Sequence, residues 1–263
     1  ETLAKFSVIF LVFLRVPFSS AALESIIFLE DFINFLTSEM VYSRFSIERF
    51  KLFFVSISKS LLTLLKAGDH IVASSSLYGG TFNLLNVTLP RLGITTTFVD
   101  ASNTESFKDA LQENTRAFFV ESLGNPKLDV LDLKAISKEA KAAKVPLIVD
   151  NTVATPALLN PIEHGANIVI HSLTKYIGGQ GTSLGGAIID AGTFDWTNGK
   201  FPEFTEPSAG YHGLVYSEAL GAAAFTFKLI LEGLRDFGGA LSPFNAFQII
   251  QGLETLPVRI KQH

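Results

Sequence analysis

Short apolar runs alternate with stretches of helical spacing from Leu61 onward. The runs are rich in β-branched and aromatic residues and are bounded by turn residues, which predicts strands. Two stretches between them, GGTFNLLNVTLPRLG and LDLKAISKEAKAAK, carry apolar residues at helical intervals. The predicted strands are HIVASS (70–75), ITTTFVD (94–100), TRAFFVES (115–122), PLIVD (146–150), NIVIHS (167–172) and GGAIID (185–190).

This alternation of strand and helix predicts an α/β fold with a mostly parallel sheet and helices on both faces. Ligands bind to such sheets beyond the carboxyl ends of the strands. Catalytic and ligand-binding residues are therefore expected among the residues that directly follow each strand.

Residues 1–60 show a different pattern. They hold 11 of the 24 phenylalanines, one proline and no glycine, so turn residues are nearly missing. Helical spacing occurs in LESIIFLEDFINFL (23–36). The apolar run 6–14 is shorter than the ~20 residues of a bilayer span, and we interpret it as a buried strand or helix, with a signal-peptide core as the alternative. The expected division is a Phe-rich arm or misread segment over 1–60 and one large domain over 61–263.

Composition narrows the class of protein. Hydrophobic residues make up 48% of the 263 residues, enough for a sizeable core, and the formal net charge of -4 argues against a nucleic-acid partner. Cysteine is absent, which excludes disulfides and thiolate metal sites. His164 and His171 lack metal-ligand spacing, so no metal is predicted. No other segment resembles a membrane span, so no membrane partner is predicted.

An acid and an amine follow two successive predicted strands. Asp150 ends PLIVD, and Lys175 comes just after NIVIHS. If the two strands are parallel, both side chains emerge at the same edge of the sheet. Pyridoxal phosphate (PLP) needs such a pair, an amine that bonds its aldehyde and a carboxylate that holds its ring nitrogen protonated. Each residue alone has a plainer interpretation, a solvated surface lysine and a turn-capping aspartate.

Other polar residues fall on the same predicted edge. Ser172 and Thr174 carry hydroxyls two residues apart that could bind a phosphate, or serve ordinary turn chemistry. Tyr78 in SSLYGGT could stack on a pyridine ring, and Asn125 in ESLGNPK could donate to a ring oxygen, although both motifs are also plain turn signals. His171 is interpreted as a strand-end or core histidine.

Taken together, these motifs resemble a known family, the PLP-dependent enzymes of cysteine and methionine metabolism. The resemblance covers about three quarters of the chain, from about Lys66 to Lys261. GTSLGG and FDWTNGKFP indicate the branch that acts on O-acetylhomoserine, the sulfhydrylases. The matching runs are KAGDHIVASSSLYGGT, ESLGNPKLDVLDL, VPLIVDNTVATP, PIEHGANIVIHSLTKYIGGQGTSLGG, FDWTNGKFPEF and YHG.

The resemblance implies a role for each candidate. Lys175 and Tyr78 would be catalytic, Lys175 as the Schiff-base lysine that also moves protons on the substrate, in a shielded setting, and Tyr78 by stacking on the ring. The other implied cofactor contacts are Asp150 to the pyridinium nitrogen, Ser172 and Thr174 to the phosphate, and Asn125 to the ring hydroxyl oxygen.

The resemblance also implies a fold and a reaction. The fold would be the large domain of a fold-type-I PLP-dependent transferase, with the C-terminal small domain and its substrate-binding arginine largely missing. The reaction would be γ-replacement, in which sulfide or methanethiol displaces acetate from O-acetylhomoserine and gives homocysteine or methionine. The partners would be a small amino-acid substrate and further copies of the chain, as a dimer or tetramer, in the cytoplasm.

Some positions depart from the family pattern. The family's glycine-containing phosphate loop is replaced by LFFVS at residues 52–56, and Gln180 stands where a histidine is common. Tyr42-Ser43-Arg44 matches a motif that reaches a neighbouring subunit, but it lies too close to Tyr78 for the usual register. Methionine γ-lyase, cystathionine γ-synthase and a catalytically dead fragment therefore stay as alternatives.

Overall fold

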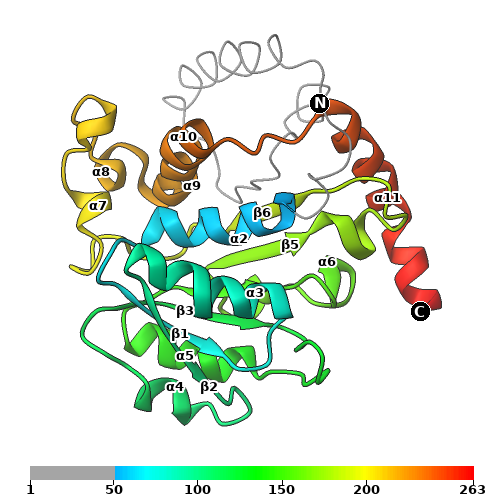
Figure 1. Ribbon diagram of the computed structural model, residues 1–263, viewed down its shortest axis with the longest axis horizontal. Helices are drawn as coiled ribbons and strands as arrows, with labels where there is room; N and C mark the ends of the chain where they lie inside the picture. The colour runs from blue at the N-terminus through cyan, green and yellow to red at the C-terminus, as the bar shows by residue number, and fades with distance from the viewer. Residues whose placement is uncertain (1–50) are drawn as a thin grey trace.

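The computed structural model describes residues 51–263, with side chains from residue 56. It contains one six-stranded sheet in the order β2-β1-β3-β4-β5-β6 (Figure 1). Neighbouring strands are parallel from β2 to β5, and only β6 runs antiparallel to its neighbour. The strands are β1 His70–Ser74, β2 Thr95–Val99, β3 Thr115–Glu121, β4 Leu147–Asp150, β5 Ile168–Ser172 and β6 Gly186–Asp190. Each predicted strand segment contains one of them, and the mostly parallel sheet is confirmed.

Helical segments connect the strands, as the spacing predicted. GGTFNLLNVTLPRLG forms a chain of short helical turns, and LDLKAISKEAKAAK contains α5, which Asp132 caps by accepting the Ala135 N–H at 3.1 Å. The helical segments are α2 Lys51–Leu64, α3 Gly79–Asn83, η3 Leu84–Thr88, η4 Leu89–Leu92, α4 Glu105–Asp109, α5 Leu133–Ala142, α6 Thr155–Leu158, η5 Pro161–His164, η6 Leu173–Ile177, α7 Pro202–Thr205, η7 Ala209–Tyr211, α8 Tyr216–Leu220, η8 Gly221–Ala223, α9 Ala224–Lys228, η9 Leu229–Leu234, α10 Arg235–Phe237 and α11 Pro243–Gln262.

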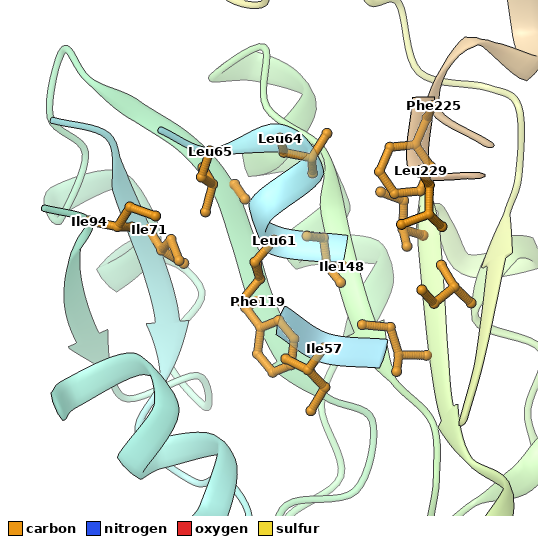
Figure 2. Packing of buried hydrophobic residues seen from close by; sticks show 14 of the residues in the cluster. Ile57, Leu61, Leu64, Leu65, Ile71, Ile94, Phe119, Ile148, Phe225 and Leu229 are labelled. Atoms are coloured by element: carbon orange, nitrogen blue, oxygen red, sulfur yellow. The ribbon is translucent and has the colours of Figure 1, made fainter. Parts of the chain in front are cut away.

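Alternate residues of the strands enter two separate cores, because successive side chains of a strand point to opposite faces. Phe119 and Ile148 pack under Ile57 and Leu61 of α2 (Figure 2). The other alternate residues of the same strands, such as Val120, point to the opposite face and join the core under α5. The sheet is therefore apolar on both faces, as a parallel sheet covered by helices requires, and the prediction of helices on both faces is confirmed.

Helix α2 anchors the N-terminal side of the described region. It runs without a break across residue 60, and its Ile57 and Leu61 are fully buried. Full burial of one such side chain contributes about 2 kcal/mol. Residues 52–56, where the family has its glycine loop, are helical here. The motif 42–44 and the predicted helix 23–36 lie outside the described residues, and the boundary at residue 60 stays a prediction.

The run FDWTNGKFPEF forms an aromatic cluster in the core under α2 and α9. Trp196 stacks on Phe204 with ring centroids 4.4 Å apart, and Phe225 of α9 stacks on the same indole at 5.7 Å. Trp196 and Phe201 are 3% and 1% exposed. The run that indicated the sulfhydrylase branch is therefore a packing element of this fold.

Helix α11 covers the end of the sheet next to β5 and β6 (Figure 1). It begins at Pro243, with Ser242 accepting the Asn245 N–H at 3.2 Å as its N-cap. Ile249 and Leu256 on its inner side pack against Leu173 and Ile177 of η6. Among residues 51–263, no helix is both long and apolar enough to cross a membrane.

Candidate active site at the carboxyl ends of β3, β4 and β5

Three polar side chains end neighbouring strands on one face of the sheet. Glu121 and Asp150 are register partners in β3 and β4, and Ser172 ends β5 two residues beyond the partner of Asp150. Side chains of a strand alternate between the two faces of the sheet, and these three residues lie on the face where Phe119 and Ile148 pack under α2. The side chains therefore emerge at the carboxyl edge of the sheet, where ligands of parallel sheets bind.

Asp150 is one of two buried acids at this edge and is 4% exposed. Its Oδ1 accepts the Thr152 N–H at 2.9 Å and the Thr152 hydroxyl at 2.5 Å. Both hydrogen bonds that reach this carboxyl from the described residues end on Oδ1, which leaves Oδ2 for another donor. Burial raises the pKa of Asp150 to about 6, and the bonds from Thr152 act against that rise. A protonated pyridine nitrogen would supply both the missing donor and the missing positive charge.

Ser172 offers a hydroxyl without a partner. The residue is 1% exposed, and its Oγ finds no hydrogen bond among the described residues. Its backbone N–H donates to Thr152 Oγ1 at 2.8 Å, so Thr152 links the ends of β4 and β5. Because a buried hydroxyl is costly without a partner, this orphaned group fits an anion such as a phosphate.

Thr174 fits the phosphate role less well. Its hydroxyl donates to the Gly185 carbonyl at 3.3 Å and accepts the Gly185 N–H at 3.1 Å. These bonds join η6 to the start of β6 and use the only proton of the hydroxyl. Its contact with a phosphate stays a prediction.

Lys175 lies in η6, directly beyond β5, at the same edge as Asp150. Its backbone leaves the helical region, with φ -87° and ψ -128°. Leu173 and Ile177 on either side are 2% and 4% exposed, so both side chains point inward. Lys175 itself is exposed. The described residues alone do not shield this amine, because the flanking apolar residues take the buried side of the turn, and the shielded setting of Lys175 stays a prediction.

Tyr78 and Asn125 lie on two loops that share one acceptor, Glu121. The backbone N–H of Tyr78 donates to Glu121 Oε1 at 2.7 Å, and the backbone N–H of Asn125 also bonds this carboxylate. Both residues are half-buried. Glu121 thus ties the loop after β1 to the loop after β3, beside Asp150. Stacking by Tyr78 and donation by the Asn125 side chain stay predictions.

Glu121 and Thr152 are site residues that the sequence reasoning missed. Burial, and then the charge of Asp150, raise the pKa of Glu121 to about 8. Perturbed carboxyl groups of this kind cluster at functional sites. The signal was present in TRAFFVE, where an acid directly follows the apolar run AFFV.

The loop after β3 is packed closely against the loop after β1. The Ser76 hydroxyl donates to Asp129 Oδ1 at 2.6 Å, and the Gly124 N–H donates to the Asp129 carbonyl at 2.9 Å. A Cβ atom on Gly124 would overlap both side chains. Glycine at 124 is therefore required by close approach, and the position of Asn125 follows from it.

His171 lies on the opposite face of β5 and is 5% exposed. Burial lowers the pKa of His171 to about 4, so the ring is neutral near pH 7. This agrees with its interpretation as a core or strand-end histidine. Within residues 51–263, no group of three or more potential metal ligands comes together.

Comparisons with known proteins agree with this geometry. The family described as Cys/Met metabolism PLP-dependent enzyme matches residues 54–263. O-acetyl-L-homoserine sulfhydrylase from Leptospira meyeri is 57% identical over 212 residues, which are 78% of this chain and 48% of that protein. Homocysteine synthase from Schizosaccharomyces pombe is 52% identical over 207 residues, with the same coverage. The chain thus spans about half the length of the curated relatives it matches.

A solved structure is similar in fold as well as in sequence. It is a putative O-acetylhomoserine (thiol)-lyase from Campylobacter jejuni that contains N'-pyridoxyl-lysine-5'-monophosphate. It superposes with a TM-score of 0.75 at 40% identity, over 78% of this chain and 51% of that one. With a family match over four fifths of its residues and the fold of a fold-type-I PLP enzyme, this chain belongs to the Cys/Met metabolism PLP-dependent enzyme family.

Proposed function

We propose that this chain forms the PLP-binding part of an O-acetylhomoserine sulfhydrylase. The reaction is γ-replacement, in which sulfide or methanethiol displaces acetate and homocysteine or methionine results. One observation carries the proposal: Asp150, the orphaned Ser172 hydroxyl and Lys175 all lie at the carboxyl edge of β4 and β5. The names of the relatives support the choice of substrate.

In this proposal PLP, when bound, supplies a ring that withdraws electrons from the substrate carbon next to its nitrogen. Asp150 Oδ2 would accept a hydrogen bond from the protonated ring nitrogen and so keep the proton on that nitrogen. The Ser172 hydroxyl donates to the phosphate, and the ring of Tyr78 covers one face of the pyridine. Asn125 donates to the ring hydroxyl oxygen.

Lys175 would hold the cofactor through its aldehyde, and its amine would be free to act as the acid and base once the substrate amine has taken its place there. The freed amine would take protons from the α- and β-carbons of the substrate and return them after acetate has left and the sulfur nucleophile has added. Because Lys175 is exposed in the described chain, we propose that a second copy covers this edge in a dimer or tetramer. A cytoplasmic location is part of the same proposal.

The experiment is absorption spectroscopy of the protein titrated with PLP, followed by product analysis. We expect a visible absorption band that Lys175→Ala abolishes and that Lys138→Ala, a change at an exposed lysine of α5, leaves intact. Product analysis then compares O-acetylhomoserine plus sulfide with methionine alone. Homocysteine from the first mixture supports the sulfhydrylase, and methanethiol from the second supports a methionine γ-lyase.

A catalytically dead fragment is the second candidate, and one observation favours it. Residues 52–56 are part of α2, so the family's glycine loop is not formed there. A protein saturated with PLP that shows no Lys175-dependent band would support this candidate and contradict the first.

A further inference from the structure

The inner side of α11 is shaped to fit the turn that carries Lys175. Gly252 of α11 lies so close to the turn that a Cβ atom there would be 2.6 Å from the Ile177 carbonyl oxygen. At the end of the helix, the ring of His263 meets the ring of Tyr176 edge-on, with centroids 5.4 Å apart. Helix α11 and the residue that ends the chain therefore contact the two residues that follow Lys175 at several points.

Arg259 makes the polar part of this contact. Its Nη1 donates to the Tyr176 carbonyl at 2.7 Å, and its Nη2 donates to the Ile177 carbonyl at 3.2 Å. The same guanidinium is held within α11, by the Gly252 carbonyl at 2.7 Å and the Thr255 hydroxyl at 3.1 Å. The planar fork of arginine thus joins two backbone carbonyls of the turn to the helix.

The guanidinium of Arg259 contacts only uncharged oxygens. None of the ion pairs among residues 56–263 includes it. Its hydrogen bonds occupy Nε, Nη1 and Nη2. The guanidinium of Arg259 is therefore committed to the backbone of the turn and to its own helix.

The turn depends on such outside contacts because its own helical pattern is interrupted. The backbone leaves the helical region at Lys175, so a regular ladder of hydrogen bonds does not set the direction of this residue. A rotation of the next peptide bond would move the amine, at the end of a four-carbon side chain, by ångströms. Misplacement of a reacting group by about 1 Å costs up to roughly a hundredfold in rate.

We propose that Arg259 is a positioning residue for Lys175, an inference that rests on the proposed function. It holds the carbonyls of Tyr176 and Ile177 against α11 and so fixes the direction in which the Lys175 amine leaves the turn. Helix α11 then supports the catalytic lysine through a contact between Arg259 and Tyr176, which are 83 residues apart in sequence.

The test compares Arg259→Gln with Lys261→Gln, a change at an exposed cation in the last turn of α11. We expect Arg259→Gln to raise the PLP concentration at half-saturation roughly tenfold, the size seen when a residue that orients a ligand-binding group is removed. We also expect it to shift the pH midpoint of the visible band. Lys261→Gln should change neither value, and Arg259→Lys, which keeps one donor group, should recover part of the loss.

A second measurement needs no cofactor. The N–H groups of Gly178 and Gly179 donate to the carbonyls of Leu173 and Lys175, both at 2.8 Å, and close the turn. Hydrogen exchange at these two amides should be faster in Arg259→Gln than in the wild type and unchanged in Lys261→Gln. Hydrogen exchange therefore tests the role of Arg259 independently of the proposed function. A wild type without a Lys175-dependent band would overturn the proposed function, whereas the exchange result would still decide the role of Arg259.

The proposal is overturned if Arg259→Gln keeps the wild-type half-saturation, pH midpoint and amide exchange. It is also overturned if Lys261→Gln changes them equally. If neither variant of Arg259 folded, the residue would serve global stability and not the direction of Lys175, and the proposal would fail as well.

Discussion

The pair of buried carboxyl groups at the ends of β3 and β4 leads to a prediction for stability against pH. Glu121 is 5% exposed and has Asp150 as its register partner. Its pKa rises from 4.5 to about 8, first because burial disfavours the charged form and then because of the charge of Asp150. Glu121→Gln removes the titration but keeps an oxygen that accepts the Tyr78 N–H.

The direction in which the free energy of unfolding changes with pH follows from the number of protons that the folded and unfolded chains bind. Above pH 4.5 the unfolded chain has lost the Glu121 proton, whereas the folded chain keeps it up to about pH 8. Unfolding therefore releases a proton in this range, and the free energy of unfolding falls as pH rises. The contribution of Glu121 is fully present below pH 4.5 and is lost by the time the pH passes about 8.

The interval from pH 6.5 to 8 contains most of the contribution of Glu121, but other groups titrate there as well. Burial lowers the pKa of Lys59 to about 8, and the lowered pKa values of His70 and His171 leave these two rings to titrate near pH 6.5 in the unfolded chain, all with the opposite sign. The contribution of Glu121 is therefore read as the difference between the wild type and Glu121→Gln, which should change by roughly 2 kcal/mol across the interval at about 1.4 kcal/mol per pH unit.

The assay is urea unfolding of the cofactor-free protein at pH 6.5, 7.2 and 8, followed by the fluorescence of Trp196, the only tryptophan of the chain. From pH 6.5 to 8 the free energy of unfolding should fall by roughly 2 kcal/mol relative to Glu121→Gln, both in the wild type and in the control Glu254→Gln, an exposed position of α11. Equal slopes in Glu121→Gln and the wild type would refute the reasoning.

Two further predictions concern packing. Gly124→Ala should lower the free energy of unfolding by about 1–3 kcal/mol, because the added Cβ overlaps the Asp129 carboxylate. The control Gly210→Ala should not show this loss, since nothing lies within 4 Å of the added atom. Equal urea midpoints for the two variants would contradict the close approach at Gly124. Trp196→Ala should lower the free energy of unfolding by about 3–5 kcal/mol, because it opens a cavity beside Phe204. The measurement is thermal unfolding followed by circular dichroism, and an unchanged Tm would show that the aromatic cluster is not part of the core.

Part of the candidate site could be predicted from the sequence because its signals are local. The apolar runs located the strands, and the residue that follows each strand of a parallel sheet falls at one edge, which places Asp150, Ser172 and Lys175 together. The motifs around them indicated the family, which the comparisons confirm.

The remaining features depend on contacts between distant segments. Glu121 bonds the Tyr78 N–H because β1 and β3 are neighbours in the sheet, a pairing that no local pattern encodes. Lys175 is exposed because Leu173 and Ile177 turn toward α11, and Arg259 reaches the same turn from that helix. Composition and periodicity thus determined the elements and the edge at which they meet, while strand order and helix packing decided which side chains are buried, charged or held there. The physical reason is that propensity and alternation act within a few residues, whereas desolvation and hydrogen-bond partners are set by the residues that folding brings together from elsewhere in the chain.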